Sequence, residues 1–260
     1  MRCSKMLLFA LSSAIASSSE TLSQAAAYLL KHRPNHDCDV NIYEHAEAAL
    51  AARANSRWAA AVPWEIFCDN VLPYACLDEP RTPENWRPLL FERCRPLVEG
   101  ASSTSEAALM LNEKLWDELN VHYEPNLSPT YLAPLDVIES GKASCSGLSL
   151  LLVAACRSVG VPARVAGVGD WGDGSGNHVW VEVYGDDDGA WHHLGAAEPS
   201  ALDETWFNER LARADGPLVY ASSYRREDAE EQRFPVPWRD DLAEEIFVPG
   251  VEVTERYRGL

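Results

Sequence analysis

The sequence of 260 residues is long enough for one large domain, or for one domain with a helical annex. Apolar residues make up 47% of it and charged residues 24%, a balance that is typical of folded chains and excludes a disordered protein. Its 40 acidic residues outnumber its 22 basic residues, which gives a formal net charge of -18. A field of this sign repels nucleic acid and anionic membranes, so we expect neither as a partner, whereas a neutral or basic polypeptide suits the charge.

The N-terminus has the pattern of a secretory signal peptide. Two basic residues precede an apolar stretch over residues 6–16, which ends in the small-residue tripeptide Ala14-Ile15-Ala16. We therefore predict a signal peptide over residues 1–16 and a secreted protein, or one in the lumen of the secretory pathway. The alternative is a frayed apolar helix on a cytoplasmic protein, because Ser12 and Ser13 interrupt the stretch. No later segment has the roughly 18 uninterrupted apolar residues of a membrane span.

Six cysteines follow the predicted signal peptide. In an oxidising compartment four of them could pair, but a chain of this size folds without such links, so reduced core cysteines are equally compatible with the sequence. The six are Cys38, Cys68, Cys76, Cys94, Cys145 and Cys156.

Helical patterning dominates residues 20–125, which we predict to be an all-helical region. Ser103 and Glu106 have the spacing of a capping box, and the positions after them carry apolar residues on one helical face. Proline-rich stretches over residues 80–88 and 125–134 interrupt the pattern and indicate connections.

The pattern changes within residues 126–225, which we predict to be the catalytic core. A short helix ends at Gly141, and a strongly apolar helix runs from Cys145 to about Val159, where Gly160 and Pro162 stop it. Three segments rich in β-formers follow, separated by Gly/Asp-rich turns. They are Ala163–Val168, His178–Tyr184 and Trp191–Leu194. These elements predict an α+β fold in which a helix packs on an antiparallel sheet, followed by a charged C-terminal extension over residues 226–260.

Cys145 is the candidate nucleophile. Ser144 is a good N-cap residue, so Cys145 stands at the first position of the apolar helix. The helix dipole and free backbone N–H groups there favour the thiolate, and we expect them to lower the pKa of the thiol toward neutrality. The same N–H groups can donate to an oxyanion. The simpler alternative is an ordinary buried cysteine.

His178 is the candidate general base. Strand alternation places His178, Trp180 and Glu182 on one face and the intervening valines on the other, which we expect to pack on the core. A histidine beside a large aromatic residue and a Gly-rich turn is suited to a cleft. A single strand histidine is more often structural, but its pairing with a cysteine at a helix start favours catalysis.

Glu198 is the candidate acid that orients the imidazole. A hairpin pairs Tyr184 with Trp191 or His192, which places His178 opposite Ala197 or Glu198, and of these two only Glu198 can accept a hydrogen bond. A slip of one residue would turn Glu198 to the wrong face, and Asp203 is the rival acid.

The sequence gives little reason to expect a metal or another cofactor. His192 and His193 point to opposite faces of a strand and lack a partner at ligand spacing. The acidic turns over residues 170–177 and 186–188 do not complete an EF-hand loop, so we interpret them as solvated turns.

Three separated motifs resemble the core of the transglutaminase-like superfamily, whose fold is papain-like. They are Ala143-Ser144-Cys145-Ser146-Gly147, the stretch from Cys156 to Arg164, and Asn177-His178-Val179-Trp180-Val181-Glu182-Val183. The similarity covers residues 134–207 and implies a triad in the order cysteine, histidine, acid. The family usually has Asp-Pro where this chain has Glu198-Pro199, a substitution seen in bacterial-type members.

The resemblance implies acyl transfer through a thioester, and three functions remain open. The first is a hydrolase of peptide or side-chain amides, and the second is a transglutaminase that joins glutamine to an amine. The third, a binding module without turnover, has no need of all three of Cys145, His178 and Glu198. Candidate oxyanion donors upstream of the cysteine are Trp116, Tyr123 and Tyr131.

Overall fold

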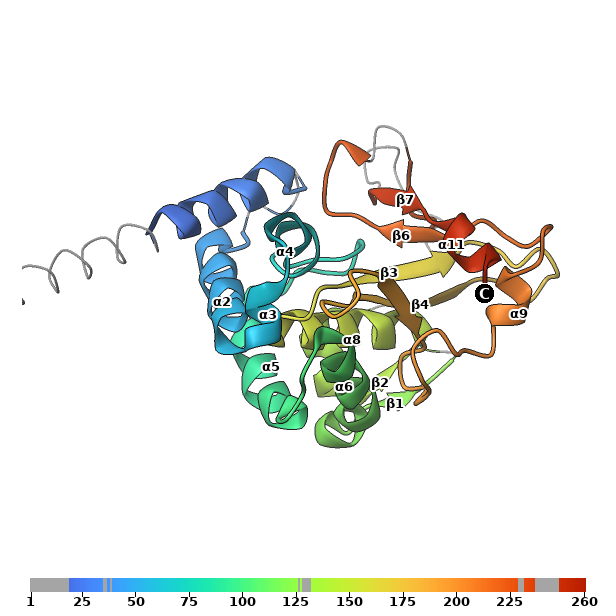
Figure 1. Cartoon of the computed structure of the whole chain (residues 1–260), viewed down its shortest axis with the longest axis horizontal. Helices are drawn as coiled ribbons and strands as arrows, with labels where there is room; N and C mark the ends of the chain where they lie inside the picture. The colour runs from blue at the N-terminus through green and yellow to red at the C-terminus, as the bar shows by residue number, and fades with distance from the viewer. Residues whose placement is uncertain are drawn as a thin grey trace, which may run out of the picture.

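The computed structural model describes residues 19–34, 37, 39–125, 127, 132–228, 232–236 and 248–260. N-terminal helices precede a second group of helices that packs on a five-stranded antiparallel sheet (Figure 1). The predicted α+β fold class is therefore confirmed. The predicted signal peptide, Cys38 and Tyr131 lie outside the described residues. None of the described helices combines the length and apolarity that a membrane span requires.

The N-terminal helices form their own apolar cluster. Residues 19–32 are helical, and Ala25 and Leu29 pack there with Phe67 and Leu72. The helices that follow are α2 (Ile42–Asn55), α3 (Arg57–Ala61), α4 (Trp64–Asn70) and α5 (Trp86–Cys94), with a 3₁₀ turn at Arg95–Val98. Both α2 and α5 contact α8 (Cys145–Val159), the central helix of the core. The N-terminal helices therefore pack against this helix.

Two buried arginines strengthen this junction. Arg87 of α5 donates hydrogen bonds to the carbonyls of residues 71–73, and Arg157 donates to those of residues 70, 73, 75 and 163. Carbonyls beyond a helix end lack helical partners, and the guanidinium groups provide them with donors. Arg157 belongs to the second family-like motif, so that motif ties the helical half to the core.

The core helices begin and end at the predicted signals. α6 (Thr104–Leu119) follows Ser103, whose hydroxyl accepts from the backbone N–H of Glu106. α7 (Pro134–Ser140) ends at Gly141, and α8 (Cys145–Val159) ends at Gly160, where φ is 93°. A Cβ on Gly160 would meet the backbone of Ala52 and the side chain of Ala59, so glycine also allows the close approach of α2.

The sheet has the strand order β5-β4-β3-β6-β7. Its strands are β3 (Ala163–Val168), β4 (His178–Tyr184), β5 (Trp191–Leu194), β6 (Tyr220–Ser222) and β7 (Gly250–Glu252), and a separate parallel pair consists of β1 (His122–Tyr123) and β2 (Lys142–Ala143). The three predicted strands have the predicted bounds, whereas β6 and β7 were not predicted. β7 lies in the predicted C-terminal extension and pairs with β6. α9 (Asn208–Leu211) and α11 (Thr254–Arg258) complete the described elements.

The two faces of β4 separate as predicted. Val179, Val181 and Val183 join the core cluster that includes α8, while Trp180 packs with Phe207 and Tyr257 on the opposite face. Glu182 is buried on that opposite face and forms ion pairs with Arg164 and Arg256. Neutralised in this way, Glu182 is a structural residue of the sheet.

Candidate active site

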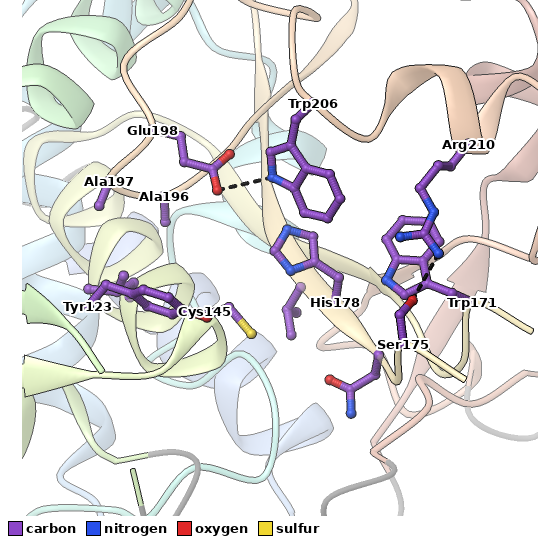
Figure 2. Close-up of a pocket in the computed structure, with 13 residues that line it drawn as sticks. Tyr123, Cys145, Trp171, Ser175, His178, Ala196, Ala197, Glu198, Trp206 and Arg210 are labelled. Atoms are coloured by element: carbon purple, nitrogen blue, oxygen red, sulfur yellow. Dashed lines mark hydrogen bonds between the residues drawn. The ribbon is translucent and has the colours of Figure 1, made fainter. Parts of the chain in front are cut away.

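A pocket of about 350 Å³ opens where α8 and β4 begin. Cys145, His178 and Glu198 all line it, and Figure 2 shows the three side chains around one space. They come from the start of α8, the start of β4 and the loop after β5, so the topology brings together three residues that are distant in sequence. Its other walls include Tyr123, Trp171, Trp206 and Arg210.

Cys145 occupies the predicted first position of α8. Ser144 is the N-cap, and its hydroxyl accepts from the backbone N–H of Gly147 at 3.4 Å. The expectation of a lowered pKa is wrong for the resting thiol, because burial raises the pKa of Cys145. Hydrogen bonds from the backbone of Val179 and Ser146 act in the opposite direction but do not offset burial.

Cys145 is the most accessible cysteine among the described residues. Cys68, Cys76, Cys94 and Cys156 are buried, and no disulfide joins any of these five. Burial raises the pKa of both Cys68 and Cys94 to about 12. Nucleophilic chemistry at a cysteine of the described chain is therefore best placed at Cys145.

His178, the first residue of β4, lies in an aromatic enclosure. Its ring centroid is 5.1 Å from that of Trp206, 5.2 Å from that of Phe207 and 6.3 Å from that of Trp171. Burial in this enclosure, with a smaller contribution from the positive charge of Arg210, lowers the pKa of His178 to about 4. The resting imidazole is thus neutral at pH 7, the form that can accept a proton.

His178 also carries an unused polar atom. Its Nε2 is buried and has no hydrogen-bond partner within the described part of the chain. Buried polar atoms are nearly always paired, and the explanations for an exception include a catalytic role and an ordered water. One ring nitrogen of His178 is therefore not occupied by any protein group of the described residues.

Glu198 lines the pocket but makes no hydrogen bond to His178 among the described residues. The predicted register Tyr184 opposite Trp191 is present, yet the ladder ends at the pair Val181 and Leu194. The chain then turns, with Ala197 at φ 62°, so Glu198 is not reached by extending the ladder. Its carboxylate instead accepts from Nε1 of Trp206 at 3.1 Å, and burial raises its pKa.

Asn112 of α6 holds the loop that carries Glu198, a role that the sequence analysis missed. Its Nδ2 donates to the carbonyls of Gly195 and Glu198 at 2.9 and 3.3 Å, and its Oδ1 accepts from the backbone N–H of Ala197 at 3.0 Å. The side chain is 1% exposed. A polar residue on the apolar face of a predicted helix was the available signal.

Asp203, the alternative candidate for the orienting acid, contacts His192 and His193 instead of His178. Its carboxylate lies 2.6 Å from Nδ1 of His192 and 2.9 Å from Nδ1 of His193, and it accepts from the backbone N–H of His193. Although burial opposes the effect, these hydrogen bonds lower the pKa of Asp203 strongly. It does not line the pocket.

The acidic turns have protein partners. Asp186 accepts from the backbone and hydroxyl of Thr104 at the start of α6, and Asp173 pairs with Arg210. The described residues contain no group of three or more histidine, cysteine or acidic side chains arranged to hold a metal ion.

Two of the three candidate oxyanion donors can be placed. Tyr123 lines the pocket, whereas Nε1 of Trp116 donates to the carbonyl of Asn112 at 2.7 Å. Tyr123 is therefore the better candidate of these two.

The central part of the chain matches a known protein family. Residues 92–196 match the family model described as transglutaminase-like superfamily, and the chain thus contains a domain of that superfamily. The match begins near the end of α5 and so includes α6 with Asn112. No curated protein matches the chain.

One solved structure is similar to part of the chain. It is the crystal structure of a "putative cysteine protease" from Cytophaga hutchinsonii, 20% identical, with a TM-score of 0.35. The alignment covers 45% of this chain and 39% of that one, so this chain spans about two fifths of its length.

Proposed function

We propose that this protein is a thiol-dependent acyl-transfer enzyme that acts on peptide or side-chain amides. Cys145 is the nucleophile, His178 the general base and Glu198 the orienting acid. The observation that carries the proposal is that all three line one pocket, with the cysteine at a helix N-terminus. The superfamily domain supports the reaction class.

The resting charges define the first step. Because burial favours the neutral thiol and the neutral imidazole, His178 takes the thiol proton as sulfur attacks the amide carbonyl. Free N–H groups at the start of α8 can donate to the developing oxyanion. The imidazolium then returns the proton to the leaving amine, which departs and leaves a thioester on Cys145.

The negative charge of Glu198 stabilises the imidazolium. In the resting pocket its carboxylate is bound to Trp206, whose ring lies next to His178. When the ring of His178 becomes charged, the carboxylate rotates toward it. The carboxylate then accepts a hydrogen bond from His178 in place of the one from Trp206. Water is the proposed acceptor for the thioester, and a polypeptide is the proposed substrate.

A thiol-directed activity probe tests this function. We expect a peptidyl vinyl sulfone to label Cys145 in the folded protein, with much slower labelling in His178→Gln. Cys94→Ser, a change at a buried cysteine outside the pocket, is the matched control and should label like wild type. Labelling that is unchanged by His178→Gln would count against the proposal, and so would modification of another cysteine first.

A further inference from the structure

Arg210 gives the pocket a positive wall. It belongs to α9, and its guanidinium carbon stands 4.0 Å from the ring centroid of Trp171. Figure 2 shows Arg210 and Trp171 on the opposite side of His178 from Cys145. Stacking on an indole fixes the plane of the guanidinium and leaves its edge available for hydrogen bonds.

The guanidinium has unused donors. Both of its hydrogen bonds use Nη2, which donates to Asp173 at 2.6 Å and to Ser175 at 2.9 Å. Nη1 and Nε have no protein acceptor in the described part of the chain. Both paired edges of a guanidinium include Nη2, so a further carboxylate can accept a single hydrogen bond from Nη1 or Nε, or form a two-bond pair where it replaces Asp173.

The present counter-ion is weakly held. Asp173 is 58% exposed and follows Gly172, in a loop where Gly172, Gly174 and Gly176 all have positive φ. Exposed ion pairs contribute little stability, so a second carboxylate can bind beside Asp173 or displace it.

The net charge of the protein makes the cationic side chain of Arg210 in the pocket informative about the substrate. A net charge of -18 repels anions in general. Arg210 is nevertheless the one cationic side chain among the described residues that line the pocket. Arg210 is thus the group of the described lining that can attract an anionic part of a substrate.

We propose that Arg210 forms a carboxylate subsite, so that preferred substrates are amides that also carry a free carboxylate. This inference rests on the proposed function, because Cys145 defines the reacting end. The carboxylate can come from a peptide C-terminus or from an acidic side chain, which share the chemistry that Arg210 recognises.

Three iodoacetylated reagents of nearly equal size test the subsite. Iodoacetyl-glutamine carries an α-carboxylate, iodoacetyl-isoglutamine a side-chain carboxylate, and iodoacetyl-glutamine amide is neutral. Alkylation rates of Cys145 are measured by mass spectrometry and divided by the rates with glutathione. We expect one acid to react about three- to tenfold faster than the neutral reagent, since a charge-assisted hydrogen bond favours its binding. The acid that reacts faster identifies the source of the carboxylate.

Variants assign the effect to Arg210. Arg210→Gln should remove the preference, whereas Arg213→Gln, an equal change of charge at an exposed residue outside the pocket, should keep it. Asp173→Asn should increase the preference because it removes the competing carboxylate. Asp215→Asn is its exposed control.

The outcomes separate the two proposals. If the neutral reagent alkylates Cys145 but no acid is preferred, or the preference survives Arg210→Gln, the subsite is overturned and the proposed function stands. If the neutral reagent fails to select Cys145 over the other cysteines, both proposals are overturned. Should Arg210→Gln lose its fold, two other variants decide the assignment. Asp173→Asn should increase the preference, whereas Arg210→Lys should decrease it because lysine keeps the charge but not the planar guanidinium.

Discussion

Glu198 accepts a hydrogen bond from the indole N–H of Trp206, and the Trp206 ring lies 5.1 Å from the ring of His178. The proposed acid is therefore connected to the proposed base through an aromatic side chain in the resting pocket. Trp206 is 56% exposed, so substrate can displace it. This arrangement makes the roles of Glu198 and Trp206 separable by mutation.

The first prediction is that Glu198→Gln reduces turnover by roughly two to four orders of magnitude, because the imidazolium loses its negative partner. The amide oxygen of glutamine can still accept from Trp206, so the resting geometry is retained. Turnover with a peptide amide substrate is the measurement. Asp203→Asn is the matched control: it should reduce stability through His192 and His193 and leave the turnover of the folded fraction within a few-fold. The reverse pattern would make Asp203 the acid.

The second prediction separates the Trp206 contact from the charge. Trp206→Phe keeps an aromatic ring near His178 but removes the donor to Glu198. If the carboxylate acts by turning to His178, this variant should retain turnover within about tenfold of wild type. A loss as large as that of Glu198→Gln would instead show that the hydrogen bond to Trp206 is the functional interaction.

The third prediction concerns protonation. Burial first, and Arg210 second, lower the pKa of His178 to about 4, so its ring should titrate well below the ordinary value of 6.5 in NMR spectra recorded between pH 3 and 8. His192 is the internal control. Burial opposes its protonation, but hydrogen bonds to Asp203 and Asp188 raise its pKa.

The Arg210→Gln variant checks the sign of that shift. Removing a positive charge favours the imidazolium, so the midpoint of His178 should move upward in this variant. Arg213→Gln should leave it unchanged. A midpoint for His178 near 6.5 in wild type would contradict the enclosed environment, and assignment follows from the resonance missing in His178→Gln.

The fourth prediction is that Asn112→Leu reduces both stability and turnover. It leaves the backbone groups of residues 195, 197 and 198 without their partner, which should cost about 2–4 kcal/mol in the free energy of unfolding in urea. Turnover should fall even when all molecules are folded, because the loop of Glu198 loses its anchor. Asn70→Leu replaces a buried asparagine outside the pocket and should affect stability only. If Asn112→Leu and Asn70→Leu reduced turnover equally, the positioning role of Asn112 would be contradicted.

Sequence signals were sufficient where the determining residues are neighbours along the chain. Ser144 and Gly160 mark the two ends of α8, and alternation identifies the valine face of β4. These features depend on caps and periodicity, which are local properties.

The remaining features depend on contacts between distant segments. The turn after Leu194 is held by Asn112, more than 80 residues earlier, so no extrapolation of the β4–β5 ladder could place Glu198. β6 and β7 are three residues each, too short for a periodic pattern. The pKa of Cys145 depends on the depth of burial, whereas the sequence showed only the helix terminus.

The fifth prediction is that the mature protein lacks residues 1–16 and is exported. We propose this from the basic start and the apolar stretch of the N-terminus. N-terminal sequencing of protein recovered from its native source is the measurement. An intact Met1 would contradict the predicted signal peptide and favour a cytoplasmic enzyme.

The last prediction is that water, rather than an amine, usually resolves the thioester. The pocket of about 350 Å³ has room for one substrate group, and its walls include the exposed rings of Tyr123 and Trp206. Transfer to a protein amine requires space for a second macromolecule and exclusion of water. The net charge of -18 acts in the other direction, because it raises the local concentration of lysine-rich acceptors.

Incubation of a glutamine-containing peptide library with and without cadaverine distinguishes the two acceptors. We expect cleaved or deamidated products in both conditions, and Cys145→Ser should abolish them. High ionic strength provides a second control, because screening weakens any charge-driven recruitment of the amine but leaves attack by water unchanged. Dominant incorporation of cadaverine at millimolar concentration would identify a transglutaminase, and its decrease with salt would show that the acidic surface recruits the amine.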